Sequence, residues 1–108
     1  VGPNPSLYNN ELRLSPVQYG VAKAALHHLT RELSIRLAPD IRVNCVAYGG
    51  FAGRQNTSFQ KRYAQLAPIG RMLNENDAGG PVAFLLDDFS ASAVTGHVLV
   101  VDGGWSVW

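Results

Sequence analysis

The sequence predicts an α/β fold built on a parallel sheet. Two short runs rich in β-branched residues, 41–47 and 97–101, are typical of strands. Segments with apolar residues at helical spacing precede the first run and lie between the two. Strands that are joined through helices form a right-handed parallel crossover. Two parallel strands do not make a stable sheet alone, because parallel sheets have several strands and both faces covered. We therefore expect further strands from sequence before residue 1, or a rearranged or oligomer-dependent fragment.

The first helix is predicted to begin at Ser15 and to be stopped by Pro39. Ser15 is a good N-cap, Pro16 suits the first helical position, and Gln18 completes a capping box. The residue before a proline avoids the α conformation, which explains the stop. Apolar residues recur at helical spacing at Ala22, Ala25, Leu26, Leu29, Leu33 and Leu37. Residues 1–14 lack this period and are expected to form a loop.

The next elements are a strand, a turn and a second helix. The strand, residues 41–47, is expected to be mostly buried. The turn Tyr48-Gly49-Gly50 indicates a place where the backbone comes close to another group. The second helix is predicted to begin near Asn56 or Thr57 and to stop at Pro68.

A third helix and a last strand complete the predicted order. The helix lies within residues 74–88; it is weakened at residues 79–81 by the run Gly-Gly-Pro and is apolar over 82–86. The strand over 97–101 is closed by a turn at Asp102-Gly103-Gly104.

The composition argues against several classes of partner. A net charge of +1 disfavours a nucleic-acid or membrane surface as the main partner, since both need clustered cations. No apolar run reaches about 18 residues, and the first residues do not look like a leader, so we expect neither a membrane span nor a signal peptide. The single Cys45 suits a reducing cytoplasm. The adjacent His27 and His28 point about 100° apart on a helix and make a poor metal clamp.

Tyr19 and Lys23 lie four residues apart on the first predicted helix, so both side chains face one side of it. Such a pair often arises by chance and can be two surface residues. Chemistry offers another reason. A phenol titrates near pH ~10, and an ammonium within about 4–6 Å favours its ionised form and lowers its pKa. A phenol tuned in this way can exchange a proton with a carbonyl or hydroxyl oxygen.

Several motifs in order resemble the short-chain dehydrogenase/reductase family. The stretch YGVAKAALHHLTRELSIRLAPDIRVNCVAYGG, which begins at Tyr19, is similar to the family's Y-x-x-x-K motif, long helix and R-V-N strand. PIGRMLNENDAGGPVAFLLDD resembles the segment before the family's last helix, and TGHVLVVDGG resembles its last strand. The resemblance runs from about Val1 to Trp105. Because several motifs occur in the family's order, it is more specific than Y-x-x-x-K alone.

This resemblance implies the C-terminal portion of a Rossmann-like doubly wound parallel sheet, comprising helices and the last two strands. Residues 1–108 would be the C-terminal part of one domain, whose dinucleotide-binding half is absent. The implied activity is NAD(P)-dependent interconversion of a small alcohol and a ketone, in a cytoplasmic homodimer or homotetramer.

The resemblance also implies roles for individual residues. Tyr19 would be the general acid/base, and Lys23 would favour its ionisation and bind the nicotinamide ribose. Tyr48, Gly49 and Phe51 match the family's turn, whose backbone contacts the nicotinamide of NAD or NADP. Hydride transfer itself belongs to the cofactor.

The chain departs from the family pattern in three ways. It contains neither the G-x-x-x-G-x-G phosphate loop nor the upstream family asparagine. Ser6 stands 13 residues before Tyr19, where the family's catalytic serine is common, but its loop-like surroundings favour a serine before Val1 instead. Tyr48 replaces the family's proline, which is expected to loosen the turn, and Gly53 replaces a frequent threonine.

Other residues are expected to be structural. Asn44 is expected to hydrogen-bond nearby backbone, and Cys45 to be a small core residue. His27 and His28 are expected to lie at the surface or in a subunit contact. The resemblance implies that Asp102-Gly103-Gly104 fixes a turn near the subunit interface. Trp105 and Trp108 are expected to pack in an interface, because exposed indoles would be unfavourable. Residues 56–63 match the family's substrate lid. Members that modify bacterial sugars and surface polysaccharides look most similar.

A non-catalytic alternative stays open from the sequence. A truncated piece could retain its helix surfaces and serve only self-association. The missing phosphate-binding residues favour this alternative, whereas the Tyr19/Lys23 pair favours descent from an active enzyme. Saturable binding of NADH or NADPH separates the two hypotheses.

Overall fold

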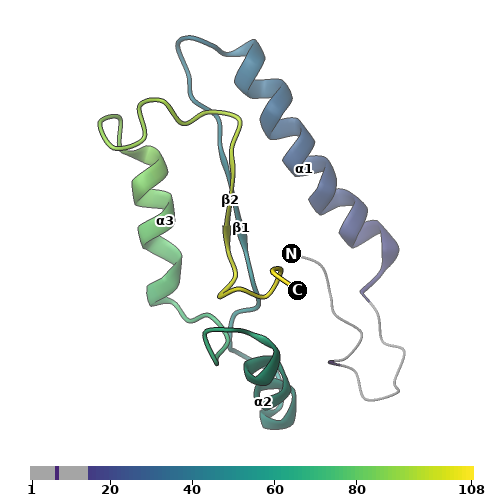
Figure 1. Ribbon diagram of the computed structural model, residues 1–108. Coiled ribbons are helices and arrows are strands. Elements are labelled where there is room, and N and C mark those ends of the chain that lie inside the picture. The colour runs from purple at the N-terminus through teal and green to yellow at the C-terminus, as the bar shows by residue number, and fades with distance from the viewer. Residues whose placement is uncertain (1–6, 8–14) are drawn as a thin grey trace.

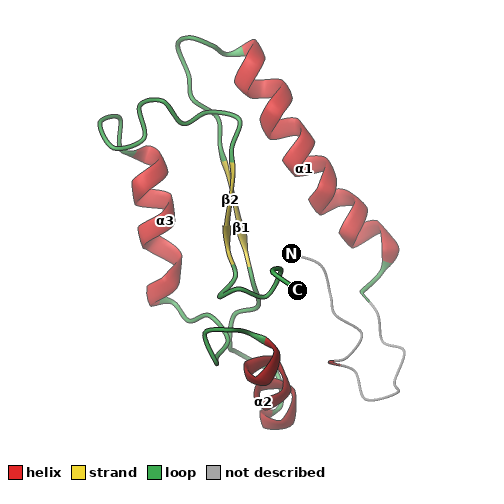
Figure 2. Ribbon diagram, in the orientation of Figure 1, coloured by secondary structure: helices red, strands yellow, loops and turns green. Residues whose placement is uncertain are grey.

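The computed structural model describes Leu7 and residues 15–108 of the chain. Helices α1 and α3 lie on opposite sides of the strands, and α2 lies beyond one end of them (Figure 1). The described residues form five elements: α1 (Val17–Arg36), β1 (Cys45–Tyr48), α2 (Thr57–Leu66), α3 (Asn76–Leu86) and β2 (Val98–Val101). Figure 2 shows the same arrangement by type of element. The predicted α/β class and element order are confirmed.

The strands β1 and β2 pair in parallel, as the sequence predicts. Cys45 pairs with Val98 at one end of the register, and Tyr48 pairs with Val101 at the other. Both strands therefore end at the same edge of the sheet, the edge beside α2 (Figure 1). In open α/β folds, ligands bind outside the carboxyl ends of parallel strands.

β1 begins four residues later than predicted, because the side chains of residues before it bind backbone groups elsewhere in the chain. The Arg42 guanidinium donates to the carbonyls of Leu85 at 2.9 Å and Val94 at 3.3 Å. The Asn44 amide donates to the Val94 carbonyl at 2.8 Å, and its oxygen accepts from the His97 N–H at 3.1 Å. These bonds replace a strand ladder, and they confirm the structural role predicted for Asn44.

The start of α1 differs from the prediction. Pro16 is the N-cap residue and no side chain caps the helix, so the capping box predicted for Ser15 and Gln18 is wrong. Pro16 has φ −52° and ψ 137°, an extended conformation that delays the helix by one residue. Its carbonyl accepts from the Tyr19 N–H at 2.9 Å. The helix ends at Arg36, before the proline that was expected to stop it.

The packed face of α1 is not the predicted apolar stripe. Thr30 and Ser34 are its buried residues, and each hydroxyl bonds a carbonyl of the same helix. Leu26 and Leu29, which belong to the predicted stripe, are each 48% exposed. Small hydroxyl side chains let the helix approach the chain before β2, whereas the leucines remain uncovered within this chain.

α2 begins where it was predicted, and α3 lies within the predicted residues 74–88. Asn56 caps α2, because its side chain accepts from the Phe59 N–H at 2.8 Å. α3 is continuous through Gly79, Gly80 and Pro81, the residues that were expected to weaken it. Its first turn is fixed by Asp77, whose carboxylate accepts from the Asn74 N–H at 2.8 Å. An acid in the first turn also interacts favourably with the helix dipole.

The core lies between α2 and the C-terminal segment and comprises Leu7, Tyr63, Ala67, Met72 and Trp105. The rings of Tyr63 and Trp105 stack with centroids 4.1 Å apart and planes inclined by 7°. Trp105 is therefore buried inside the chain, and the prediction that it packs in an interface is wrong. Trp108 is exposed, and its indole N–H donates to the Leu66 carbonyl at 2.9 Å.

Asp102 fixes the turn after β2, as predicted. Its carboxylate accepts from the Gly104 N–H at 2.8 Å, and from the N–H and hydroxyl of Ser106 at 3.0 and 2.6 Å. Burial raises the pKa of Asp102, but these hydrogen bonds together lower it by more, so the carboxyl stays ionised to lower pH than usual.

Candidate active site

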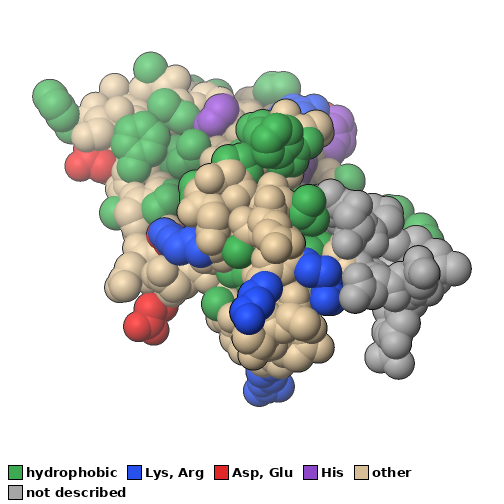
Figure 3. All heavy atoms as spheres, turned by 60° about the horizontal axis from the view of Figure 1, so that its bottom comes forward, with side chains coloured by type: hydrophobic (Ala, Val, Ile, Leu, Met, Phe, Trp, Pro, Cys, Tyr) green, Lys and Arg blue, Asp and Glu red, His purple; other side chains and the backbone are tan. Residues whose placement is uncertain are grey.

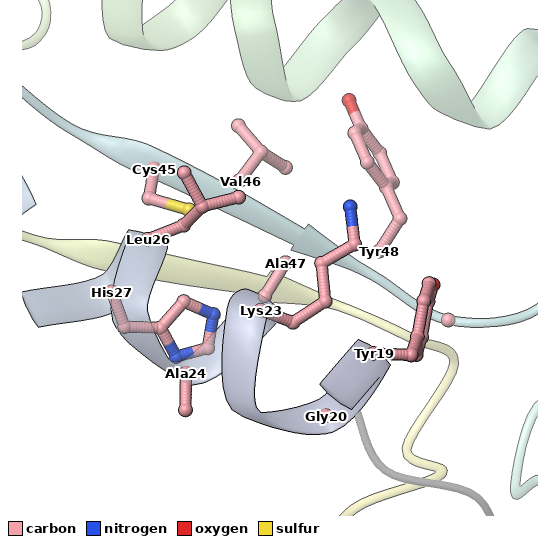
Figure 4. Close-up of a pocket in the computed structure, with 11 residues that line it drawn as sticks. Tyr19, Gly20, Lys23, Ala24, Leu26, His27, Cys45, Val46, Ala47 and Tyr48 are labelled. Atoms are coloured by element: carbon pink, nitrogen blue, oxygen red, sulfur yellow. The ribbon is translucent and has the colours of Figure 1, made fainter. Parts of the chain in front are cut away.

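A cavity of about 490 Å³ separates the first half of α1 from β1. Figure 4 shows the side chains around it. Its walls are Tyr19, Gly20, Lys23, Ala24, Leu26 and His27 of α1, and Cys45, Val46, Ala47, Tyr48 and Gly49. Successive side chains of a strand point to opposite faces of the sheet, so a cavity that touches five consecutive residues borders the edge of β1.

Tyr19 and Lys23 lie together at the end of the cavity where β1 finishes (Figure 4). The Nζ of Lys23 is 5.5 Å from the centroid of the Tyr19 ring, within the range of a cation–π contact. The Tyr19 side chain is about half exposed, with a relative exposure of 54%. The two side chains meet as their spacing predicts, and the phenol is accessible to a ligand.

In the turn after β1, most backbone groups are hydrogen-bonded within the described chain, and one N–H has no acceptor there. The Gly49 N–H donates to the Val101 carbonyl at 3.0 Å, and the Gly50 carbonyl accepts from the Leu73 N–H at 2.9 Å. Within the described part of the chain, the Phe51 N–H has no acceptor. This N–H can bind a ligand's oxygen at the carboxyl end of the strand.

Tyr48 anchors this turn to α3. Its hydroxyl donates to the Ala78 carbonyl, and its ring lies against Phe51 with centroids 5.4 Å apart. Figure 4 shows the Tyr48 side chain directed away from Tyr19 and toward a neighbouring helix. The looseness expected from replacing a proline is therefore offset by an anchor that no sequence motif indicated.

Positive charge surrounds the α2 end of the molecule. Residues 41–74 include five Arg or Lys and no Asp or Glu. Figure 3, in which this end comes forward, shows Lys and Arg side chains around it. Arg71 is paired with Asp77 and Arg42 with Asp88, but the remaining cations, Arg54, Lys61 and Arg62, make no ion pair with the described acids. A field of this sign attracts anionic ligands.

The sequence and the fold both match known enzymes. A family model described as enoyl-(acyl carrier protein) reductase matches residues 11–106. A short-chain dehydrogenase from Leptospira borgpetersenii, solved with bound NAD+, superposes with a TM-score of 0.85 at 37% identity over 96% of this chain. The chain belongs to the short-chain dehydrogenase/reductase family.

Other members of the short-chain dehydrogenase/reductase family are similar over most of the chain. The post-translational flagellin modification protein A of Campylobacter coli is 39% identical over 93% of this chain and 39% of its own length. The galactitol 2-dehydrogenase (L-tagatose-forming) of Cereibacter sphaeroides is 34% identical over 83% of this chain and 38% of its own length. The Leptospira structure is likewise covered over 39% of its length. The chain thus spans about two fifths of the family members it matches.

The structure brings together most of the residues that the family resemblance singles out. Tyr19, Lys23, Tyr48 and Gly49 line the cavity, and Phe51 follows in the same turn. Ser6 lies outside the described residues. The structure thus places Tyr19, Lys23 and the turn after β1 around one cavity.

Two residues of the cavity differ from their predicted settings. Cys45 is only partly buried, because it lies at the edge of β1 beside the cavity. His27 faces the cavity rather than open solvent, while its neighbour His28 is exposed beside Glu32 at 3.7 Å. Within the described part of the chain, no group of three metal-ligating side chains occurs.

Tyr63 of α2 is a residue of the site that sequence reasoning missed. Its hydroxyl accepts from the Gly50 N–H at 2.8 Å, and so it holds the turn that follows β1. The glycines of the Tyr48-Gly49-Gly50 turn predicted that another group approaches the backbone closely, but they did not indicate which group. The structure shows that this group is the Tyr63 side chain, because a Cβ on Gly50 would lie 2.9 Å from the Tyr63 ring.

No helix within the described ranges has the length and apolar character needed to cross a membrane.

Proposed function

We propose that this chain is the C-terminal part of an NAD(P)-dependent oxidoreductase that interconverts a small alcohol and a ketone, with Tyr19 as the general acid/base. The observation that carries the proposal is the position of Tyr19 beside Lys23 at the carboxyl end of β1. The membership of the family supports the oxidoreductase chemistry, and the two-fifths coverage of its members supports a longer parent protein.

The residues present fit the nicotinamide end of a dinucleotide. A phenol hydroxyl and an ammonium can bind ribose hydroxyls, and the free Phe51 N–H can bind an amide oxygen. The chain lacks the glycine-rich loop that would hold the phosphates, so that part of the cofactor would be bound by the rest of the parent protein. The cations around α2 would draw in an anionic dinucleotide of either kind, NAD or NADP.

Tyr19 would exchange the proton at the substrate oxygen. During oxidation its ionised oxygen accepts the alcohol proton, and during reduction its hydroxyl returns a proton to the carbonyl oxygen. The bound nicotinamide would accept or supply the hydride at the substrate carbon. Lys23 stands over the Tyr19 ring, from where its ammonium can donate to a ribose hydroxyl of the bound nucleotide.

Replacing Tyr19 by phenylalanine in the full-length protein tests the proposal. The ring and its contact with Lys23 persist while the acid/base oxygen is lost. We expect turnover of alcohol or ketone substrates to fall by about 10²–10⁴-fold, the usual contribution of general acid–base catalysis, with cofactor affinity little changed. A variant with the wild-type rate would remove Tyr19 from the mechanism. Trp108→Phe, which changes an exposed side chain outside the cavity, is the control.

The alternative of a non-catalytic self-association module has one observation in its favour. Val17, Val21 and Ile35 leave an apolar face of α1 exposed, which either the rest of a longer protein or a second copy can cover. Titration of residues 1–108 with NADH, together with the mass of the chain in solution, decides between the two. No saturable binding by a self-associated chain supports the module, and micromolar binding excludes it.

A homodimer or homotetramer of the parent protein is part of the same proposal. Light scattering of the full-length protein measures its mass directly, and a monomer at micromolar concentration would contradict it.

A further inference from the structure

Tyr63 links two parts of the molecule that the sequence keeps apart. It lies on α2, is 5% exposed, and its ring stacks on Trp105. Its hydroxyl leaves this core and accepts from the Gly50 N–H at 2.8 Å. Core packing alone does not need this oxygen, because a phenylalanine ring would fill the same place against the indole.

The hydrogen bond to Tyr63 holds the N–H of Gly50, and a second hydrogen bond holds the carbonyl of the same residue. The Gly50 carbonyl accepts from the Leu73 N–H at 2.9 Å, and the Leu73 carbonyl accepts from the Ala52 N–H at 2.8 Å. Gly50 is thus held at its N–H by α2 and at its carbonyl by the residue before α3. With these groups occupied, the Phe51 N–H is the one that this stretch leaves without an acceptor among the described residues.

The turn is built around the Tyr63 side chain. A Cβ on Gly49 would lie 3.0 Å from the Tyr63 oxygen and 2.8 Å from the Asp102 Cα. A Cβ on Gly50 would lie 2.9 Å from the Tyr63 ring. Two successive glycines therefore let the backbone close onto one hydroxyl. Burial raises the pKa of Tyr63 above its usual value of 10.0, so this hydroxyl remains neutral at ordinary pH.

We infer that Tyr63 is a positioning residue, which fixes the Gly50 peptide so that the neighbouring Phe51 N–H faces the nicotinamide. This inference rests on the proposed function, because it needs a nicotinamide at the carboxyl end of β1. Tyr63 acts through the backbone of the turn and does not itself touch the cofactor. It also couples α2 to the turn: displacement of α2 would remove the acceptor from Gly50.

Tyr63→Phe in the full-length protein tests this role, because it removes the oxygen and keeps the ring. Trp108→Phe is the matched control: it also removes one hydrogen bond to α2, from the indole to the Leu66 carbonyl, but it lies outside the turn. Three quantities are measured in each protein. They are the dissociation constant of NADH or NADPH, the values of kcat and KM, and the hydrogen-exchange rate of the Gly50 amide.

For Tyr63→Phe we expect the cofactor to bind about fivefold more weakly, the effect of losing one uncharged hydrogen bond. KM for the cofactor should rise with it, kcat at saturation should change by less than about twofold, and the Gly50 amide should exchange faster. Trp108→Phe should leave all three unchanged. Wild-type affinity and exchange in Tyr63→Phe, or an equal loss of affinity in Trp108→Phe, would overturn the inference.

The exchange measurement separates this inference from the proposed function. If the full-length protein binds no nicotinamide nucleotide, the proposed function fails and so does the role toward the cofactor. Faster Gly50 exchange in Tyr63→Phe would then show that the hydroxyl still holds the turn. If the nucleotide binds and Tyr63→Phe changes neither affinity nor exchange, the inference alone fails.

Discussion

Ser34 of α1 lies so close to Gly96 that a Cβ on Gly96 would be 2.8 Å from the serine Oγ. Gly96 has φ 70°, in the left-handed region, and its N–H donates to the Val43 carbonyl at 2.7 Å. The contact sets α1 against the segment that leads into β2. It also explains why a hydroxyl side chain, and not a leucine, occupies the buried face of this helix.

Gly96→Ala is therefore expected to destabilise the full-length protein. The left-handed conformation costs a non-glycine residue about 1–2 kcal/mol, and the clash with Ser34 adds to it. Adding Ser34→Ala should relieve the clash and leave the conformational cost. Urea denaturation measures both. Gly79→Ala, in an open place on α3, is the matched control and should stabilise by about 0.5–1 kcal/mol. Equal stability of Gly96→Ala and wild type would contradict this account.

The elements could be predicted because each has a local cause. The Asn56 side chain caps the start of α2. The strands β1 and β2 are recognisable in the sequence as apolar runs joined through helices. The errors occur where distant contacts override local preference. Arg42 and Asn44 look like part of a strand, but they bind carbonyls at residues 85 and 94, far along the chain, so the strand starts after them.

The candidate site divides in the same way. The contact between Tyr19 and Lys23 follows from helical spacing alone, and the structure has it. The partner of the Tyr48-Gly49-Gly50 turn could not be predicted, because Tyr63 reaches it across a separation of 13 residues and only through the folding of α2. Spacing identifies residues that one helix brings together. It does not identify those that two elements bring together.

Asp77 should make the start of α3 sensitive to acid. The Arg71 guanidinium, through hydrogen bonds of 2.7 and 3.0 Å, together with the Asn74 N–H, lowers the pKa of Asp77 from 3.8 to about 2. A carboxyl whose pKa is depressed on folding stabilises the protein above its unfolded pKa, and this stabilisation is lost as pH falls toward the folded value. The relevant window is from about pH 4 down to about pH 2.

A carboxyl NMR titration of the full-length protein measures this directly. The Asp77 midpoint should lie near 2 in the wild type and move toward 3.8 in Arg71→Gln. Arg71→Lys keeps the charge without the paired geometry, so its midpoint should fall between them. The stability advantage of wild type over Asp77→Asn should shrink across the same pH window. An Asp77 midpoint that stays in place in Arg71→Gln would exclude Arg71 as the main cause.

Lys23 can be separated from Tyr19 by its effect on cofactor binding. Lys23→Met removes the ammonium that stands 5.5 Å from the Tyr19 ring and keeps a flexible chain of similar length. Because the ammonium would donate charged hydrogen bonds to the nicotinamide ribose, we expect NADH or NADPH to bind about 10- to 100-fold more weakly to the full-length variant, whereas Tyr19→Phe should keep nearly the wild-type affinity. Lys23→Arg retains a cation and its donors, so its dissociation constant should lie between those of wild type and Lys23→Met. Wild-type affinity in Lys23→Met, measured by fluorescence titration, would exclude this ammonium from the cofactor site.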